Sequence, residues 1–287
     1  MSAEPVTAAE ASPWEARRLR AEALRGRYPF ADEVLALYLE LLPVADEAWR
    51  TARLAPPPPT DLVGWAVATV LPGVVAATGR AGPAALGEAV VERSAGGDPD
   101  GVLAAWLAGA ELDPVESYLA RASLAPALEA LRDRAAAACG TVPVPAGAAS
   151  CPCCGGLPQL SVVADSGDVL VTGRRSLLCA RCATSWAFSR SMCPGCGESD
   201  ENRLLVYAEQ WTGAVSRNGD VGDGSPAPVL PNLRIVGCTT CRTYLIEVDL
   251  SRDARAVPDV DELAALPLDL YAADAGLQKI TPNLMGF

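Results

Sequence analysis

The sequence predicts an α+β protein in which a helical N-terminal domain precedes two tandem cysteine-rich ribbon modules and a C-terminal helix. Three observations lead to this fold class. The first 140 residues show helical periodicity with proline-marked helix starts, nine of the ten cysteines fall between residues 151 and 241, and short β-type runs accompany those cysteines. The expected divisions are a helical domain at residues 1–140, a linker at 141–150, ribbons at 151–190 and 191–250, and a C-terminal helix and tail at 251–287.

The composition narrows the chemistry open to this chain. A formal net charge of −12 over 287 residues disfavours nucleic acids and anionic membrane surfaces as general partners. The chain has no histidine, which excludes Ser-His-Asp and Cys-His nucleophile pairs, HExxH metal sites and histidine acid–base catalysis. Any metal site must therefore use thiolates or carboxylates, and the sequence favours a protein that is not an enzyme.

The sequence predicts a cytoplasmic protein that does not insert into a membrane. Its first 20 residues lack the charged and apolar regions of a secretory signal. Leu62–Gly79 runs 18 residues without a charge, the lower limit for a membrane span. Because Pro72 and Gly73 interrupt it, we interpret this stretch as a buried helix that breaks near them.

The helical domain is predicted from apolar spacing, helix caps and prolines. One apolar stripe recurs at three- and four-residue intervals and comprises Val34, Tyr38, Leu41, Ala45 and Trp49. Pro43 should kink or split that helix, and no helix should cross Pro56–Pro59. Asp98-Pro99 and Asp113-Pro114 predict helix starts, and Glu116 completes a capping box with Asp113. Glu116–Cys139 then reads as a long helix, bent or divided at Pro126.

The chain changes character after the small, proline-containing segment Gly140–Ser150. Five β-type runs follow, at residues 159–163, 176–179, 203–208, 233–238 and 244–248. Helical patterning returns from Asp259 to about Ala275, and a short tail ends at Phe287.

Four CxxC pairs carry the strongest functional signal in the sequence. Two residues between cysteines let a tight turn direct both sulfurs at one ion, and two such turns complete a tetrahedral shell. In a cytosolic chain, repeated CxxC favours metal binding over disulfides. The eight predicted ligands are Cys151, Cys154, Cys179, Cys182, Cys193, Cys196, Cys238 and Cys241.

The pairs are of two kinds, which suggests how they combine. The pairs at 151/154 and 193/196 have the form CPxCG, and those at 179/182 and 238/241 have the form CxxCxT, followed by Trp186 and Tyr244. The region therefore reads as one unit repeated twice: a CPxCG turn, two strands, a CxxCxT turn and an aromatic strand. Sequential pairing, with the first four cysteines on one ion and the last four on the other, preserves this repeat. Interleaved pairing is the alternative, and it would break the repeat.

Two cysteines remain outside the four pairs. Cys153 lies within its turn and cannot easily reach the same ion as both neighbours, and Cys139 ends an alanine-rich helix. We interpret Cys153 as an outward-facing bystander and Cys139 as a small buried apolar residue, because no histidine is present to activate either thiol.

The order of the motifs resembles that of the FdhE family, which comprises formate dehydrogenase accessory proteins. The resemblance rests on CPCCGGLP, CARCATSW, CPGCG and CTTCRTYL in that order, followed by DELAALPLDLYAADAGL and the terminal TPNLMGF. It continues at RYPFADEVLALYLELLPVADEAW, so it extends from about Arg27 to the end. The eight CxxC cysteines match the family pattern one by one. The ending departs from it, because this chain has Pro282-Asn283 where the family tends to carry Asn-Pro-Phe.

The resemblance implies two rubredoxin-like ribbons behind a helical domain, each with one metal ion, iron being expected and zinc the alternative. It also implies a cytoplasmic, non-catalytic role in maturing a respiratory formate dehydrogenase by binding its catalytic subunit. Two other functions stay open from the residues themselves: rubredoxin-like electron transfer to a client enzyme, and, more weakly, nucleic-acid binding by zinc ribbons. Alternatively, the four-cysteine sites are purely structural, and their metal ions hold together β-hairpins that bury too little apolar surface to be stable alone.

Overall fold

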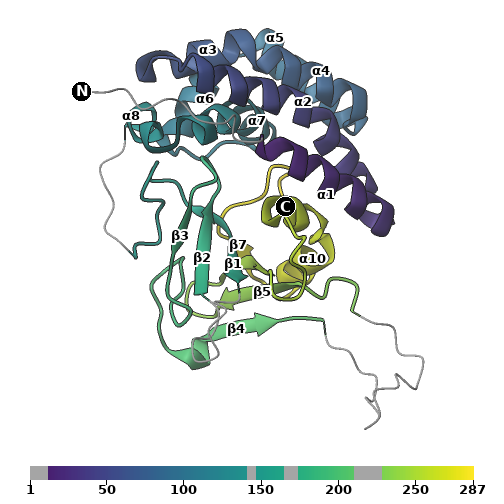
Figure 1. The fold of residues 1–287 in the computed structure, drawn as a ribbon, viewed down its shortest axis with the longest axis vertical. Coiled ribbons are helices and arrows are strands. Elements are labelled where there is room, and N and C mark those ends of the chain that lie inside the picture. The colour runs from purple at the N-terminus through teal and green to yellow at the C-terminus, as the bar shows by residue number, and fades with distance from the viewer. Residues whose placement is uncertain (1–11, 141–146, 165–173, 210–227) are drawn as a thin grey trace, which may run out of the picture.

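The computed structural model describes residues 12–140, 147–164, 174–209 and 228–287. Figure 1 shows the N-terminal helices gathered on one side of the molecule and the strands on the other, with the C-terminal segment beside the strands. The helical part comprises α1 Pro13–Arg27, η1 Pro29–Ala31, α2 Asp32–Leu54, η2 Pro59–Asp61, α3 Leu62–Thr69, α4 Leu71–Ala81, α5 Ala84–Gly96, α6 Pro99–Ala108, α7 Pro114–Leu131, η3 Arg132–Arg134 and α8 Ala135–Cys139. The predicted α+β class is confirmed.

The predicted helix starts are confirmed by their capping contacts. The Asp98 carboxylate accepts a hydrogen bond from the Gly101 N–H at 2.9 Å, and Asp113 accepts from the N–H groups of Val115 and Glu116. The Glu116 side chain reaches back to the Asp113 N–H, which completes the predicted capping box. The helix starts at α6 and α7 are thus set locally, within four residues of sequence.

Two internal prolines do not divide their helices as the sequence suggested. Helix α2 continues through Pro43, and α7 continues through Pro126 and ends at Leu131. Both helices bury apolar side chains before and after the proline, so tertiary packing holds the helix together across the lost hydrogen bond. The division of the predicted Glu116–Cys139 helix falls at Arg132, which has a positive φ of 50°.

The apolar stretch Leu62–Gly79 forms α3 and α4, which separate at Val70. Pro72 lies in the first turn of α4, where its missing N–H costs no helical hydrogen bond. The predicted break near Pro72 is therefore confirmed, two residues earlier than expected. Among the described residues no single helix is long and apolar enough to span a membrane; the bent pair formed by Pro59–Thr69 and Leu71–Ala81 meets the criteria of length and composition together.

The strands form one sheet in which the predicted repeat is visible as topology. The strands are β1 Pro158–Ala164, β2 Arg174–Cys179, β3 Ser185–Ala187, β4 Leu204–Tyr207, β5 Leu233–Cys238, β6 Thr243–Asp249 and β7 Gln278–Lys279. Each ribbon is an antiparallel three-stranded meander, β1-β2-β3 and β4-β5-β6. The sequence did not predict that the two ribbons join: β1 pairs with β6 in parallel, giving the order β3-β2-β1-β6-β5-β4.

The C-terminal segment differs from the single helix expected between Asp259 and about Ala275. It divides into α9 Pro258–Asp261, η5 Glu262–Ala264 and α10 Leu266–Asp274, and the two-residue strand β7 then pairs with β6. Pro267 explains the restart, because it lacks the N–H that would continue the preceding turn. Lys279, the only lysine of the chain, is buried beside Glu262 and lies 3.1 Å from Asp269.

One apolar core joins the helices, the sheet and the C-terminal segment. It contains Leu24 and Leu35 from the helices, Leu160 and Ile246 from the two central strands, and Leu263 from η5, all at 2 % exposure or less. Buried ion pairs reinforce this junction. Arg20 of α1 binds Asp261 at 2.5 and 2.8 Å and Asp253 at 2.9 Å. The first helix is thereby fastened to the C-terminal segment.

Candidate metal centres

The structure brings the eight predicted cysteines together in two groups of four. One group contains Cys151, Cys154, Cys179 and Cys182, and the other contains Cys193, Cys196, Cys238 and Cys241, with all sulfurs of a group within 4.8 Å of one another. These groups, named here the first and second centres, are those of the sequential pairing; the interleaved pairing does not occur.

The CPxCG turns form in the same way in both centres. In the first, the Cys151 N–H donates to the Gly156 carbonyl at 2.8 Å and the Gly155 N–H donates to the Cys151 carbonyl at 2.9 Å. The second repeats this pattern around Cys193 with the same distances. Gly155 and Gly197 have positive φ values of 70° and 79°, as the glycine in the motif predicts.

In the CxxCxT turns, the structure places the threonine hydroxyl next to the sulfur of the second cysteine, which the sequence motif alone did not predict. The Thr184 hydroxyl lies 3.2 Å from Cys182 Sγ, and the Thr243 hydroxyl lies 3.0 Å from Cys241 Sγ. Each hydroxyl is placed to donate a hydrogen bond to a thiolate. In these turns the residue after the second cysteine has positive φ without being glycine: Ala183 at 53° and Arg242 at 56°. This conformation is uncommon for side chains with a Cβ and is held here by the closed turn.

Backbone amides also point at the sulfurs. The Cys153 N–H donates to Cys151 Sγ at 3.4 Å, the Arg181 N–H to Cys179 Sγ at 3.3 Å, and the Gly195 N–H to Cys193 Sγ at 3.3 Å. These contacts favour thiolate over thiol, since a donated hydrogen bond stabilises the charged form.

The sulfur separations fit a tetrahedral ion. In the first centre Cys151 and Cys182 are 3.6 Å apart and Cys154 and Cys179 are 3.4 Å apart. In the second, Cys193 and Cys241 are 3.7 Å apart and Cys196 and Cys238 are 3.8 Å apart. Metal–sulfur bonds of about 2.3 Å give a tetrahedron edge of about 3.8 Å. Each group can therefore hold one ion, and a tetrahedral set of four thiolates suits zinc or iron.

Crowding of four thiols changes their acidity when no ion is present. In the first centre, hydrogen bonds from the other three cysteines lower the pKa of Cys151. The pKa values of those three, Cys154, Cys179 and Cys182, are raised. In the second, burial raises the pKa of Cys193 to about 12, whereas hydrogen bonds from Thr243, against the effect of burial, lower the pKa of Cys241 to about 7. An ion that binds all four thiolates must therefore displace protons.

The two centres differ in exposure. All four cysteines of the first are buried, at 3 % exposure or less. In the second, Cys193 and Cys238 are buried, Cys241 is half-buried and Cys196 is exposed. The first centre belongs to the main core, and the Trp186 indole N–H beside it donates to the Ala148 carbonyl at 3.0 Å.

The two remaining cysteines lie near the first centre, outside the group of four. Cys153 is half-buried and its thiol donates to the Arg132 carbonyl at 2.8 Å. It is thus partly covered by the helical domain, in contrast to the outward-facing position expected. Cys139 is also half-buried, and a hydrogen bond between its side chain and Cys154 lowers the pKa of Cys139.

Arg175 is a structural residue that sequence reasoning missed. Arginine is mostly exposed in proteins, yet Arg175 is 3 % exposed. It lies 3.4 Å from Glu247 of β6 and donates to the carbonyls of Ser189 and Met192. Arg175 therefore connects β2 of the first ribbon to the last strand of the second and to the segment that leads into the second centre.

Comparison with known proteins agrees with this architecture. The family model of the FdhE central domain matches residues 150–190, which coincide with the first ribbon. Among curated proteins, the "Protein FdhE homolog" of Aquifex aeolicus is 31% identical over 137 residues, 48% of this chain and 41% of that protein. The homologue of Pseudomonas putida is 34% identical over 142 residues, 49% of this chain and 40% of that protein. This chain thus aligns with about two fifths of the length of these relatives.

A solved structure extends the likeness to nearly the whole fold. The crystal structure of the FdhE protein from Pseudomonas aeruginosa covers 96% of this chain and 96% of its own, with a TM-score of 0.66 and 24% sequence identity. The fold and its two four-cysteine groups thus define a class: a helical domain fused to a pair of zinc-ribbon-like, metal-binding motifs. Within that class, the proteins that this chain resembles are members of the FdhE family.

Proposed function

We propose that this protein is a non-catalytic accessory factor that matures a formate dehydrogenase in the cytoplasm by binding its catalytic subunit. The observation that carries the proposal is the similarity to FdhE proteins, together with a second ribbon that reproduces the first. The absence of histidine supports it, because the centres lack the side chain that most often serves as general acid or base.

The eight CxxC cysteines are the proposed metal ligands, and each centre would hold one iron or zinc ion. The sulfur separations and the amide and hydroxyl donors around them support this assignment. A bound ion would fasten two turns of each ribbon and so preserve the surface that a partner recognises.

A deletion strain tests the proposed function directly. Formate dehydrogenase activity should fall to background without the gene and return with the wild-type gene on a plasmid. Affinity capture of the complementing protein should recover the catalytic subunit, and metal should be measured on the same sample. Full activity in the deletion strain would refute the proposal.

The exposure of the second centre favours electron transfer as a second candidate function. An iron ion held by four cysteines can cycle between Fe(III) and Fe(II), and the exposed Cys196 brings this centre to the surface where a client could approach. Protein purified without added iron should then contain iron and absorb visible light. Stoichiometric zinc with no visible absorption would exclude electron transfer while leaving the accessory role intact.

A further inference from the structure

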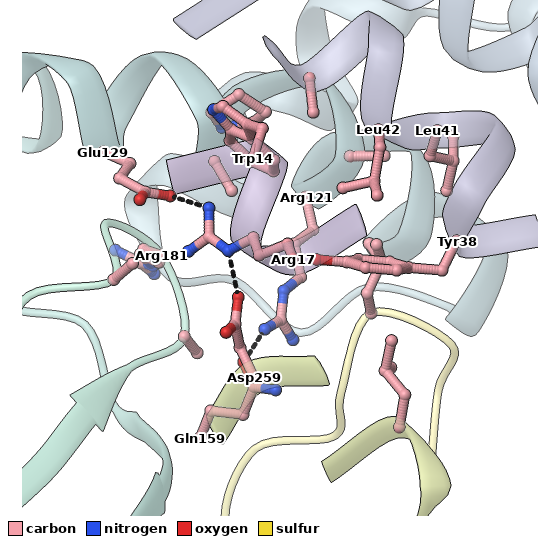
Figure 2. Close-up of a pocket in the computed structure, with 18 of the residues that line it drawn as sticks. Trp14, Arg17, Tyr38, Leu41, Leu42, Arg121, Glu129, Gln159, Arg181 and Asp259 are labelled. Atoms are coloured by element: carbon pink, nitrogen blue, oxygen red, sulfur yellow. Dashed lines mark hydrogen bonds and ion pairs between the residues drawn. The ribbon is translucent and has the colours of Figure 1, made fainter. Parts of the chain in front are cut away.

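A cavity of about 100 Å³ lies between the helical domain and the first ribbon, and Figure 2 shows it in close-up. Its walls come from α1, α2 and α7 on the helical side and from the Cys179–Ala183 turn and the C-terminal segment on the other. A single water needs roughly 10–15 Å³ by this measure, so the cavity has room for a molecule of several heavy atoms.

Two side chains of the cavity wall carry donors without a hydrogen-bond partner in the described part of the chain. Tyr38 is 7% exposed as a residue, and no hydrogen bond joins its hydroxyl to another described residue. In Figure 2 its phenol oxygen is at the end of the ring that faces Arg17 and Arg121. Trp14 lines the same cavity, and its buried indole Nε1 also lacks a partner among the described residues. Buried polar groups rarely remain unpaired in native proteins, so the Trp14 indole calls for an acceptor.

Arg121 adds a cation whose guanidinium binds no carboxylate within the described residues. It donates to the Pro282 carbonyl at 2.7 Å and to Gln159 Oε1. Surrounding protein lowers the pKa of Arg121 by desolvation, yet the residue keeps an intermediate exposure. A guanidinium that faces the cavity accounts for both the desolvation and the intermediate exposure of Arg121.

The acceptors of the wall are already engaged. Glu129 and Asp259 both bind Arg17, at 3.0 and 2.6 Å. The Gln159 oxygen accepts from Arg121, and its amide group donates to Glu262 at 3.0 Å. Counting Arg181, three arginines face two carboxylates in this wall. Burial raises the pKa of Glu129, and the ion pair with Arg17 opposes this effect.

We propose that this cavity binds a small organic carboxylate, with its oxygens on Arg121 and Tyr38 and its alkyl body against the apolar helical wall. The planar guanidinium of Arg121 matches the geometry of a carboxylate. The wall offers donors on Tyr38 and Trp14, while its two carboxylates already bind Arg17, so it favours an anion over a cation. Leu41, Leu42 and Val74 form the apolar wall, and this wall distinguishes a carboxylate with a short alkyl chain from an inorganic anion.

Calorimetric titration of the full-length, metal-loaded protein tests the proposal with sodium formate, acetate and butyrate, and with chloride and sulfate at matched ionic strength. Butyrate should bind about tenfold more tightly than acetate, because two more methylene groups leave water. Chloride and sulfate should not compete. A structure of the butyrate-soaked protein should show the ligand in the cavity.

Two tyrosine variants provide a matched pair. Tyr38→Phe removes a hydroxyl with no partner, so it should leave the melting temperature unchanged and weaken butyrate binding about tenfold. Tyr118→Phe removes a hydroxyl that lies 2.5 Å from that of Thr78, outside the cavity. It should lower stability and leave binding unchanged. Arg121→Gln should abolish binding.

Several results would overturn the inference. No binding heat at millimolar carboxylate, equal affinity in Tyr38→Phe and wild type, or only ordered water in the soaked cavity would each do so. Cys179 also lines the cavity and interacts electrostatically with Arg121. An alternative role of Arg121 is therefore to offset the negative charge of the first centre when it holds a metal ion. That alternative role would be established if Arg121→Gln changed the metal affinity and the wild-type protein bound no carboxylate. The binding assay needs no formate dehydrogenase, so its failure is independent of the proposed accessory function.

Discussion

The two centres have the same sequence pattern, turns and sulfur separations, yet they occupy different environments. The cysteines of the first are part of the core that the helical domain shares, whereas those of the second lie outside this core and Cys196 is exposed. The same local motif can therefore form either a buried centre or an accessible one. The environment, which the motif does not encode, makes the first centre part of the main core and leaves the second accessible.

The largest expected difference concerns loss of a ligand. Cys179→Ser should unfold the protein cooperatively or lower its stability by at least about 5 kcal/mol, because ion binding and core packing are lost together. Cys196→Ser should unfold only the second ribbon. Hydrogen exchange of the two variants checks this, with protection of α7 lost in the first and kept in the second. Equal loss of α7 protection would contradict the comparison.

Cys193→Ser separates a structural from a redox role at the second centre. Under a structural role the amides of β4 and β5 lose protection; under a redox role the fold persists while formate dehydrogenase maturation stops. Circular dichroism and complementation of the deletion strain on the same variant distinguish the two. Retention of both fold and maturation would show that this centre is dispensable.

The buried ion pair that anchors α1 should contribute more to stability than the exposed ion pairs of the same helix. Arg20→Met leaves the buried Asp261, 2 % exposed, without its cation, and should cost about 3–5 kcal/mol. Arg18→Met removes only exposed pairs with Glu15 and Glu22 and serves as the control, with a loss below about 1 kcal/mol. Urea unfolding measures both. Similar losses would mean that the junction contributes little.

Release of metal should follow exposure. A chelator should remove the ion of the second centre at least about tenfold faster than that of the first, since only the second presents an exposed sulfur. Because the thiol pKa of Cys193 is raised to about 12, the metal-free second centre holds a proton there at neutral pH. Metal affinity should therefore rise with pH and fall on acidification. Single-phase release would contradict the comparison.

The smallest effect is expected from the two threonines. Thr184→Val and Thr243→Val each remove one hydroxyl next to a sulfur, and each should cost about 1 kcal/mol. Thr243→Val should also raise the pKa of Cys241 above its value of about 7 in the metal-free protein. Alkylation rates of the metal-free protein as a function of pH measure this shift, and an unchanged profile would show that the hydroxyl does not act on the thiol.

The sequence predicted best what depends on neighbouring residues. The capping box, the CPxCG turns and the four CxxC pairs all follow from residues a few positions apart. The split at Pro43 and the division at Pro126, each offered as one of two outcomes, do not occur, and the single C-terminal helix was wrong. It gave no indication that the only lysine, Lys279, is buried between two carboxylates.

By itself the sequence determined which cysteines form pairs, because a two-residue spacing directs two sulfurs at one point regardless of the rest of the chain. It also determined that the unit is duplicated. Only the tertiary structure decided how the copies differ. The β1–β6 pairing, the burial of the first centre and the cavity that brings Tyr38 to Arg121 join residues more than 80 positions apart. Such contacts depend on the packing of whole elements, which no local spacing records.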